Sequence, residues 1–208
     1  MPVSPAPDAT TAALVLLSGG LESTVAATLY ARRGPVHALF VAYDQRAVTA
    51  ERAAAEAVAD TLGITLHVAD LTSLGRLARG DRAWQRHVPL PHRNACLVGT
   101  AASLAPSLGC ASVVLGINAE DASAVADAGV GFLEPQALAL EALGVSLTLP
   151  LSRMTKAEVV RLGGRIGAPI AQSYSCLLGR RPPCGGCPQC RKRAEAEALA
   201  GSRPAPDW

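Results

Sequence analysis

Residues 18–24, Ser-Gly-Gly-Leu-Glu-Ser-Thr, constrain the fold of this chain more than any other stretch. The preceding residues 12–17 form a short apolar run typical of a buried parallel strand, and helix-forming residues occupy 25–32. The pattern predicts a strand, a glycine turn and a helix. Two glycines let the backbone approach a ligand closely, and the unpaired amides that open a helix favour an anion. A bound phosphate is the natural ligand of such a turn.

The loop differs from two common phosphate-binding motifs. A Walker loop ends in Gly-Lys-Ser/Thr, but residues 18–24 contain no lysine, and the G-x-G-x-x-G dinucleotide fingerprint is absent. The sequence does match S-G-G-x-[DE]-S, the pyrophosphate loop of enzymes that cleave ATP into AMP and pyrophosphate. The alternative is a glycine-rich turn that only joins a strand to a helix. The ATP-binding candidates are Ser18, Gly19, Gly20, Leu21, Glu22, Ser23 and Thr24.

Four cysteines near the C-terminus have the spacing of a metal site. Cys184, Cys187 and Cys190 are separated by two residues each, and Cys176 lies seven intervening residues upstream. Four thiolates at this spacing match a closed, structural zinc site, and the glycines and proline between them suit its tight turns. An iron–sulfur cluster is the nearest alternative, and free thiols or a redox pair are more distant ones.

Composition and charge limit the class of protein. The chain has 208 residues, 50% of them apolar, which allows one α/β domain with a small appendage. Its net charge of +2 gives no reason to expect a nucleic-acid surface. Residues 1–11 lack the features of a signal peptide, and the uncharged residues 95–118 are interrupted by glycine and proline. We therefore expect a cytoplasmic protein with no membrane span and no disulfide framework.

Apolar and amphipathic segments alternate along the chain. Expected strands are residues 12–17, 36–41, 64–69, 112–116 and 146–149. Expected later helices are residues 49–62, 93–108, 132–143, 155–166 and 191–200. The alternation predicts an α/β fold with a doubly wound, five-stranded, mostly parallel sheet. Residues 71–92, rich in glycine and proline, are expected to be irregular. The expected divisions are a disordered tail (1–11), an ATP-binding domain (12–170), a zinc-binding helical region (171–201) and a second tail (202–208).

The loop and the cysteines together resemble the 7-cyano-7-deazaguanine synthase (QueC/ExsB-like) family of PP-loop ATP pyrophosphatases. Intermediate stretches are similar too: residues 43–46 (Tyr-Asp-Gln-Arg), 91–94 (Pro-His-Arg-Asn, like P-G-R-N), 116–121 (Gly-Ile-Asn-Ala-Glu-Asp, like G-x-N-A-E-D), 155–158 and 173–176. The resemblance extends from about residue 14 to residue 196. It implies an adenine nucleotide α-hydrolase-like fold.

The resemblance also implies a reaction. The family is expected to convert 7-carboxy-7-deazaguanine and ammonia into 7-cyano-7-deazaguanine, a queuosine precursor, through an acyl-adenylate and an amide. Each ATP would yield AMP and pyrophosphate, and Mg²⁺ would accompany ATP because it compensates the charge of the departing pyrophosphate. The implied partners are these small molecules, with no nucleic acid and no membrane. A homodimer is compatible with the family, although no residue decides the oligomeric state.

Individual residues take roles from the same resemblance. Glu22, Lys156 and Arg93 are the catalytic candidates: Lys156 would neutralise phosphate charge, and Arg93 would bind the substrate carboxylate or a phosphate. Asp121 or Glu120 would accept hydrogen bonds from the guanine-like amino edge. The adenine is expected against Phe40, Val41 and Ala42, and the substrate against Gln45, Arg93, Asn94, Asn118, Glu120 and Asp121. Structural roles stay open: a helix cap for Arg93 and Asn94, a solvated first turn for Lys156 and a polar turn for residues 120–121.

Several positions depart from the family pattern. Glu22 replaces an aspartate, His92 a glycine and Ala47 a histidine, and residues 123–132 lack the family's polar and aromatic run. ATP chemistry and zinc are thus better supported than the substrate. One alternative is a related amide ligase of specialised metabolism, or of protein or peptide modification, with another amine acceptor. A non-catalytic nucleotide-binding scaffold is a second. A sulfur-inserting tRNA enzyme, which needs a basic surface and a catalytic cysteine near ATP, is a third.

Overall fold

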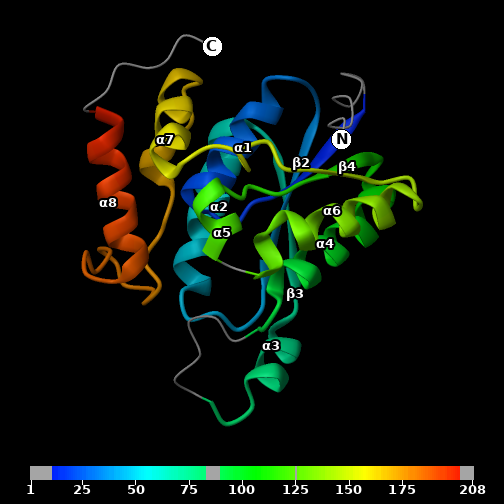
Figure 1. Cartoon of the computed structure of the whole chain (residues 1–208), viewed down its shortest axis with the longest axis horizontal. Coiled ribbons are helices and arrows are strands. Elements are labelled where there is room, and N and C mark those ends of the chain that lie inside the picture. The colour runs from blue at the N-terminus through cyan, green and yellow to red at the C-terminus, as the bar shows by residue number, and fades with distance from the viewer. Residues whose placement is uncertain (1–10, 83–89, 125, 202–208) are drawn as a thin grey trace.

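The computed structural model of the chain describes residues 11–82, 90–124 and 126–201, so the expected tails fall almost entirely outside it. Five strands form one parallel sheet in the order β3-β2-β1-β4-β5 (Figure 1). They are β1 (Ala12–Leu16), β2 (Val36–Ala42), β3 (Thr65–Asp70), β4 (Cys110–Val114) and β5 (Ser146–Thr148). The central strand pairs on both sides, with Leu14 opposite His37 of β2 and Val113 of β4. The predicted doubly wound α/β fold is confirmed.

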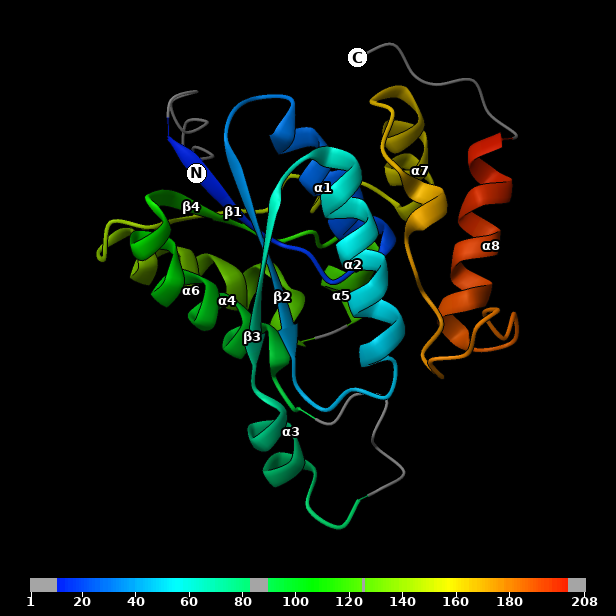
Figure 2. The same cartoon turned by 180° about the vertical axis from the view of Figure 1, so that it is seen from behind.

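Helices cover both faces of the sheet, which is why the strands are short apolar runs rather than alternating ones. On one face lie α1 (Leu21–Ala31), α2 (Val48–Leu62) and α7 (Lys156–Arg165), and on the other α4 (Arg93–Leu104) and α6 (Val130–Glu141) (Figures 1 and 2). The last helix, α8 (Pro188–Gly201), lies outside α7, where Arg161 Nη1 donates to the Leu199 carbonyl at 3.4 Å. The remaining helical turns are η2 (Ala105–Leu108), η3 (Ala126–Ala128) and η4 (Ile170–Gln172).

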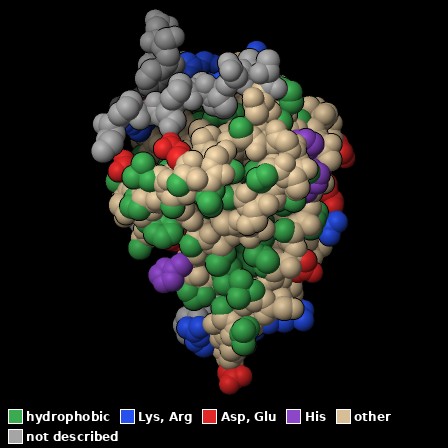
Figure 3. Space-filling view, turned by 90° about the vertical axis from the view of Figure 1, so that its right-hand side faces the viewer, with side chains coloured by type: hydrophobic (Ala, Val, Ile, Leu, Met, Phe, Trp, Pro, Cys, Tyr) green, Lys and Arg blue, Asp and Glu red, His purple; other side chains and the backbone are tan. Residues whose placement is uncertain are grey.

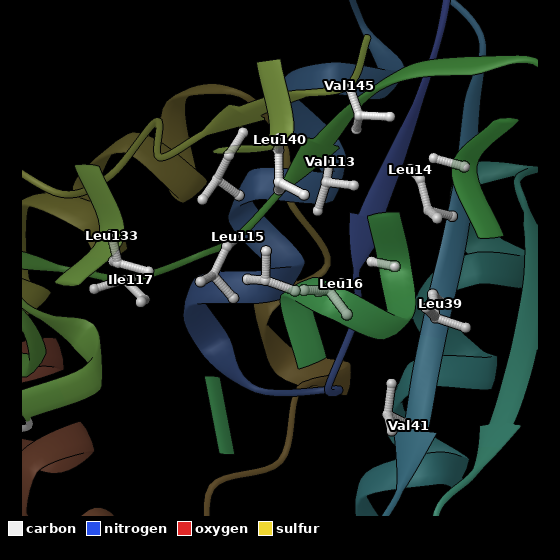
Figure 4. Packing of buried hydrophobic residues seen from close by; sticks show 14 of the residues in the cluster. Leu14, Leu16, Leu39, Val41, Val113, Leu115, Ile117, Leu133, Leu140 and Val145 are labelled. Carbon is white, nitrogen blue, oxygen red and sulfur yellow. The ribbon is translucent and has the colours of Figure 1, made fainter. Parts of the chain in front are cut away.

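The core is aliphatic, as the low aromatic content predicts. On the α4 side, Leu14, Leu39 and Val113 of the sheet belong to one buried cluster with Leu133 and Leu140 of α6 (Figure 4). On the α1 side, the cluster is rich in alanine and valine, with Phe40 as its largest fully buried side chain. Small side chains let α1 and α2 pack closely on the sheet, which fixes the loop that joins β1 to α1.

Two helices were not expected from the sequence. Residues 71–92 were predicted to be irregular, but α3 (Thr72–Arg79) forms there. Asp70 Oδ1 accepts a hydrogen bond from the Thr72 amide at 2.8 Å, and Gly75 allows close packing because a Cβ there would lie 1.9 Å from the Tyr43 carbonyl oxygen. The polar run after the fourth strand forms α5 (Ala119–Ala124), where Asn118 Oδ1 accepts from the Asp121 amide at 2.8 Å. Residues 83–89 lie outside the described residues.

Figure 3 shows how charged side chains are distributed on one face of the molecule. On the face shown in Figure 3, the drawn Lys and Arg side chains of the described residues lie towards the margins and form no continuous basic patch. Within the described ranges, no helix is both long and apolar enough to span a bilayer.

Candidate active site and metal centre

A cleft of about 260 Å³ opens where the carboxyl ends of β1, β2 and β4 meet. Ligands of open parallel sheets bind at this edge, where the strand order reverses on either side of β1. The predicted site residues that line the cleft are Ser18, Gly20, Glu22, Ser23, Phe40, Val41, Gln45, Arg93, Asn94, Asp121 and Lys156. Gly19, Leu21, Thr24, Ala42, Asn118 and Glu120 are predicted site residues outside its lining.

The glycines of the loop are required by its geometry. Gly19 has a φ of +77°, and a Cβ there would lie 2.3 Å from the Glu51 carbonyl oxygen of α2. Gly20 precedes α1 as its N-cap and makes no side-chain cap hydrogen bond. The first amides of α1 are therefore left for a ligand, as at an anion-binding helix start.

The hydroxyl groups of the loop divide into two kinds. Ser18 Oγ and Ser23 Oγ lie 3.1 Å apart and both residues line the cleft. Thr24 is fully buried, and its hydroxyl donates to the Gly20 carbonyl at 2.9 Å. Ser23 Oγ also donates to the Gly20 carbonyl, at 3.0 Å. Ser18 and Ser23 can thus contact a phosphate from the cleft, whereas Thr24 only stabilises the first turn of α1.

Glu22 and Lys156 form an ion pair at the cleft. Lys156 Nζ lies 2.5 Å from Glu22 Oε1, and Asn118 Nδ2 donates to the same oxygen at 2.9 Å. The Lys156 side chain is only 7% exposed and that of Glu22 14%, so Lys156 is not a solvated first-turn residue. The extra methylene of Glu22 is accommodated in this pair. Gly116 leaves room for the Glu22 backbone, because a Cβ on residue 116 would lie 3.0 Å from the Glu22 carbonyl oxygen.

Two contacts fix the start of α7, which carries Lys156, and the first of them was predicted. Thr155 and Glu158 form the expected capping box, with the Thr155 amide donating to Glu158 Oε2 at 2.7 Å. Glu120 Oε1 accepts from the Lys156 amide at 3.0 Å, which orients this carboxylate towards α7 rather than the cleft. Asp121 does line the cleft, and burial, followed by the charge of Glu22, raises the pKa of its carboxyl group.

A second group of polar side chains lies at the end of β2. Arg93 Nη1 donates to the Tyr43 hydroxyl at 3.4 Å, and Gln45 Nε2 donates to Glu51 Oε2 at 3.1 Å. Burial raises the pKa of both the Tyr43 phenol and the Glu51 carboxyl group. Tyr43 and Glu51 were not predicted as site residues. Glu51 lies in an alanine-rich helix, and the only feature that distinguishes it in the sequence is its position as an acidic residue in the first turn.

Asp127 caps α4, which neither Arg93 nor Asn94 does. Its Oδ2 accepts from the Asn94 amide at 2.8 Å, and its carbonyl accepts from Asn94 Nδ2 at 3.2 Å. His92, at the N-cap, has a φ of +49°, a left-handed conformation that the family's glycine adopts without strain. In the altered stretch 123–132, a buried carboxylate thus positions the helix that carries Arg93.

The four predicted cysteines converge on one point. Their sulfur atoms all lie within 4.8 Å of one another, and Cys184 Sγ is 4.0 Å from Cys190 Sγ. Zinc–sulfur bonds of about 2.3 Å imply sulfur separations of about 3.8 Å, so the set fits a tetrahedral ion. Burial opposes ionisation of Cys176, but backbone amides, first that of Cys184, outweigh it and lower its pKa to about 6. These residues can hold a metal such as zinc in a closed site.

The cysteine region is attached directly to the loop and to α2. The Tyr174 amide donates to the Gly19 carbonyl at 2.7 Å, and Arg181 Nη2 donates to the Ala50 carbonyl at 3.1 Å. Ala50 and Ala54 of α2, with Ala47 at its N-cap, form a buried cluster with Cys176 and Cys187. Four residues of this region line the cleft, namely Tyr174, Ser175, Leu177 and Gln189. The cysteine cluster therefore supports one wall of the cleft.

Comparison with solved structures defines the class of fold. The NMN synthetase of Francisella tularensis superposes with a TM-score of 0.55 over 95% of this chain and 90% of that one, at 15% identity. At this identity the likeness shows the fold alone.

Sequence comparison then gives the family. Residues 12–201 match the family model described as queuosine biosynthesis protein QueC, and the chain belongs to this family, as the resemblance predicted. The 7-cyano-7-deazaguanine synthase 1 of Sulfurisphaera tokodaii is 34% identical, over 88% of this chain and 91% of that protein. The 7-cyano-7-deazaguanine synthase of Gloeothece citriformis is 35% identical, over 91% and 92%.

Proposed function

We propose that the protein is an ATP-dependent ligase that makes 7-cyano-7-deazaguanine from 7-carboxy-7-deazaguanine and ammonia. The observation that carries the proposal is the convergence of Lys156 and the uncapped start of α1 on one cleft, in a chain related to synthases of that name over most of its length. Both groups compensate negative charge, which is what transfer of an adenylyl group requires.

ATP would bind with its phosphates on the loop and its adenine against Phe40, Val41 and Ala42. The loop amides would hold the β- and γ-phosphates with the hydroxyls of Ser18 and Ser23. Lys156 would neutralise charge that develops as pyrophosphate leaves, and Glu22 would position its ammonium group. Mg²⁺ bound with ATP would compensate the remaining phosphate charge.

The chemistry then takes place in two ATP-driven stages. In the first, the substrate carboxylate attacks the α-phosphorus and pyrophosphate leaves; ammonia then attacks the acyl carbon, loses a proton, and AMP departs with the former carboxylate oxygen. In the second, the amide oxygen is adenylated, and loss of AMP with two protons from nitrogen gives the nitrile. Adenylation is required because oxide is a poor leaving group. Arg93 would hold the substrate carboxylate, with Gln45, Asn94, Asn118, Glu120 and Asp121 as further substrate contacts or supports.

The cysteines Cys176, Cys184, Cys187 and Cys190 would hold a structural zinc ion. Zinc supplies no open coordination position when four thiolates bind it, so its role would be to fix the wall that carries Tyr174 and Leu177. A homodimer is compatible with this function but is not required by it.

A related amide ligase with another amine acceptor is the second candidate. Among the described residues of the altered stretch 123–132, Ala128 is the member that lines the cleft, while Asp127 is engaged with α4. An apolar methyl group there offers no hydrogen bond to a substrate, which favours a changed acceptor or final step.

Product analysis tests both proposals. The metal-loaded protein would be incubated with 7-carboxy-7-deazaguanine, MgATP and ammonium, and its products identified by mass spectrometry. We expect the nitrile, with AMP and pyrophosphate in equal amounts. Formation of ADP would contradict cleavage between the α- and β-phosphates. Accumulation of an amide, or conversion only with another amine, would support the second candidate instead.

A further inference from the structure

Glu51 is a carboxylate at the cleft for which the proposed reaction has no use so far. It lies in the first turn of α2, and its backbone is pressed against the loop at Gly19. Its Oε2 accepts from Gln45 Nε2 at 3.1 Å. Among the described residues, no hydrogen bond reaches its Oε1 and no Lys, Arg or His side chain forms an ion pair with it.

The orientation of Glu51 is set by a buried amide that cannot turn. Gln45 Oε1 accepts from the Tyr43 amide at 2.8 Å, so the Gln45 NH₂ group must face the other way. There it donates to the Val41 carbonyl at 3.3 Å and to Glu51. Flipping Gln45 would lose these contacts, which fixes one oxygen of Glu51 and directs the carboxylate.

A carboxylate held in this way needs donors from a ligand. Partly burying a charge without a cation partner is unfavourable unless hydrogen-bond donors compensate it. Burial, which raises the pKa of Glu51, outweighs the charge of nearby Arg93, which lowers it, and Arg93 donates its hydrogen bond to Tyr43 instead. Donors that arrive with a substrate would therefore find an acceptor already oriented, and little ordering would oppose binding.

Two of the other acidic residues at this edge are committed elsewhere. Glu22 is paired with Lys156, and Glu120 accepts from the Lys156 amide outside the cleft lining. Asp121 also lines the cleft, where the charges of Glu22, Lys156, Lys192 and Arg93 act on it. Glu51 differs because Gln45 already orients its carboxylate, which makes it the better placed acceptor for the edge of a base.

We infer that Glu51 recognises the N1–H and 2-amino edge of a guanine-type base, and so determines the specificity of the proposed ligase for a 2-amino substrate. This inference rests on the proposed function. Two parallel N–H groups match the two oxygens of a carboxylate, as in other bidentate pairs. It assigns to Glu51 the role that the sequence suggested for Asp121 or Glu120.

The test compares two substrates in matched variants of the metal-loaded protein. 7-Carboxy-7-deazaguanine and its analogue without the 2-amino group, 7-carboxy-7-deazahypoxanthine, would be compared by kcat/KM. A lost hydrogen bond to a charged group changes binding by roughly 10- to 100-fold, and the unmodified protein should prefer the parent substrate by about that factor. In Glu51→Gln the preference should fall below about threefold, chiefly through a higher KM for the parent substrate.

Two control variants separate this role from a structural one. Glu56→Gln changes an exposed carboxylate of the same helix, paired with Arg52, and should keep both the rate and the preference. Asp121→Asn should lower the rate with both substrates but keep the preference. If Glu51→Gln turns over too slowly, calorimetric binding of the two bases to the protein loaded with a non-hydrolysable ATP analogue gives the same ratio.

Two results would overturn the inference. If Glu51→Gln keeps the preference of the unmodified protein, or Asp121→Asn alone abolishes it, Glu51 does not read the amino edge, while the proposed function stands. If the unmodified protein neither binds nor converts 7-carboxy-7-deazaguanine, the proposed function and this inference fail together.

Discussion

The two walls of the cleft are stabilised in different ways. The loop wall, formed by Ser18, Gly20, Glu22, Ser23 and Lys156, contains charges that pair with each other, with 2.5 Å between Lys156 Nζ and Glu22 Oε1. The knuckle wall, formed by Glu51, residues 174–177 and Gln189, holds its carboxylate with a neutral amide and rests on the cysteine cluster. The loop wall is thus ordered by elements of the sheet, whereas the knuckle wall rests on four cysteines outside the sheet that can hold a metal.

Removing the metal should give the largest effect and should separate the two walls. Structural zinc contributes about 10–16 kcal/mol of binding free energy in small domains, and folding of its ligand region is coupled to that binding. We expect Cys187→Ser, or chelation, to abolish ligase activity and to expose amides of residues 171–201 to hydrogen exchange. Protection of β1, β2 and β4 should remain. Hydrogen-exchange mass spectrometry with metal analysis measures both.

The matched control is Cys96→Ser, which changes a partly buried cysteine outside the cluster. It should keep about one metal ion per chain, the stoichiometry of a single Cys₄ site, and retain activity. A Cys187→Ser protein with full metal content and unchanged exchange at Gly19 and Tyr174 would show that the knuckle wall does not depend on the metal.

Breaking the Glu22–Lys156 pair should have the next largest effect, confined to the loop wall. Removing one preorganised charge-stabilising group lowers turnover by roughly 10²- to 10³-fold. We expect Lys156→Ala and Glu22→Ala to lose AMP formation by about this factor while the cysteine site keeps its metal. Steady-state assays of AMP release provide the measurement.

Shortening the carboxylate is the milder companion experiment. Glu22→Asp restores the family's residue and keeps the charge that pairs with Lys156, so most of the activity should remain. Because the shorter side chain moves the carboxylate by about 1 Å and Lys156 can follow only in part, we expect a loss of no more than about tenfold. A loss as large as that of Glu22→Ala would mean that the arm length of Glu22, and not its charge, determines its role.

The features predicted from sequence are those that a contiguous stretch determines by itself. The loop of residues 18–24, the capping box of Thr155 and Glu158 and the cysteine spacing are local patterns, and each has the predicted geometry in the structure. The sheet could be predicted because buried parallel strands are short apolar runs between helices.

The features that were missed depend on packing between distant segments. Helix α3 owes its place to Gly75 against Tyr43, and α4 owes its cap to Asp127, which is 33 residues away from Asn94 in the chain. Glu51 joins the site because α2 packs on Gly19. No local pattern records such contacts, so the knuckle wall could not be derived from the sequence.

The smallest predicted effect is on stability, and it should have opposite signs in the two walls. Burial raises the pKa of Glu51 in the folded protein, so between the unfolded and folded pKa values the folded state binds more protons. The free energy of unfolding therefore falls as pH rises through this window. Glu51→Gln removes that dependence, and at neutral pH it should be as stable as the unmodified protein or more stable, by about 1 kcal/mol.

Glu22→Gln should instead destabilise the protein at neutral pH, because it leaves the buried charge of Lys156 without its partner. Urea unfolding of the metal-loaded proteins at pH 4 to 8, with Glu56→Gln as the exposed control, measures both signs. Destabilisation by Glu51→Gln that grows with pH would show that Glu51 is paired in solution, and the contrast between the walls would then be lost.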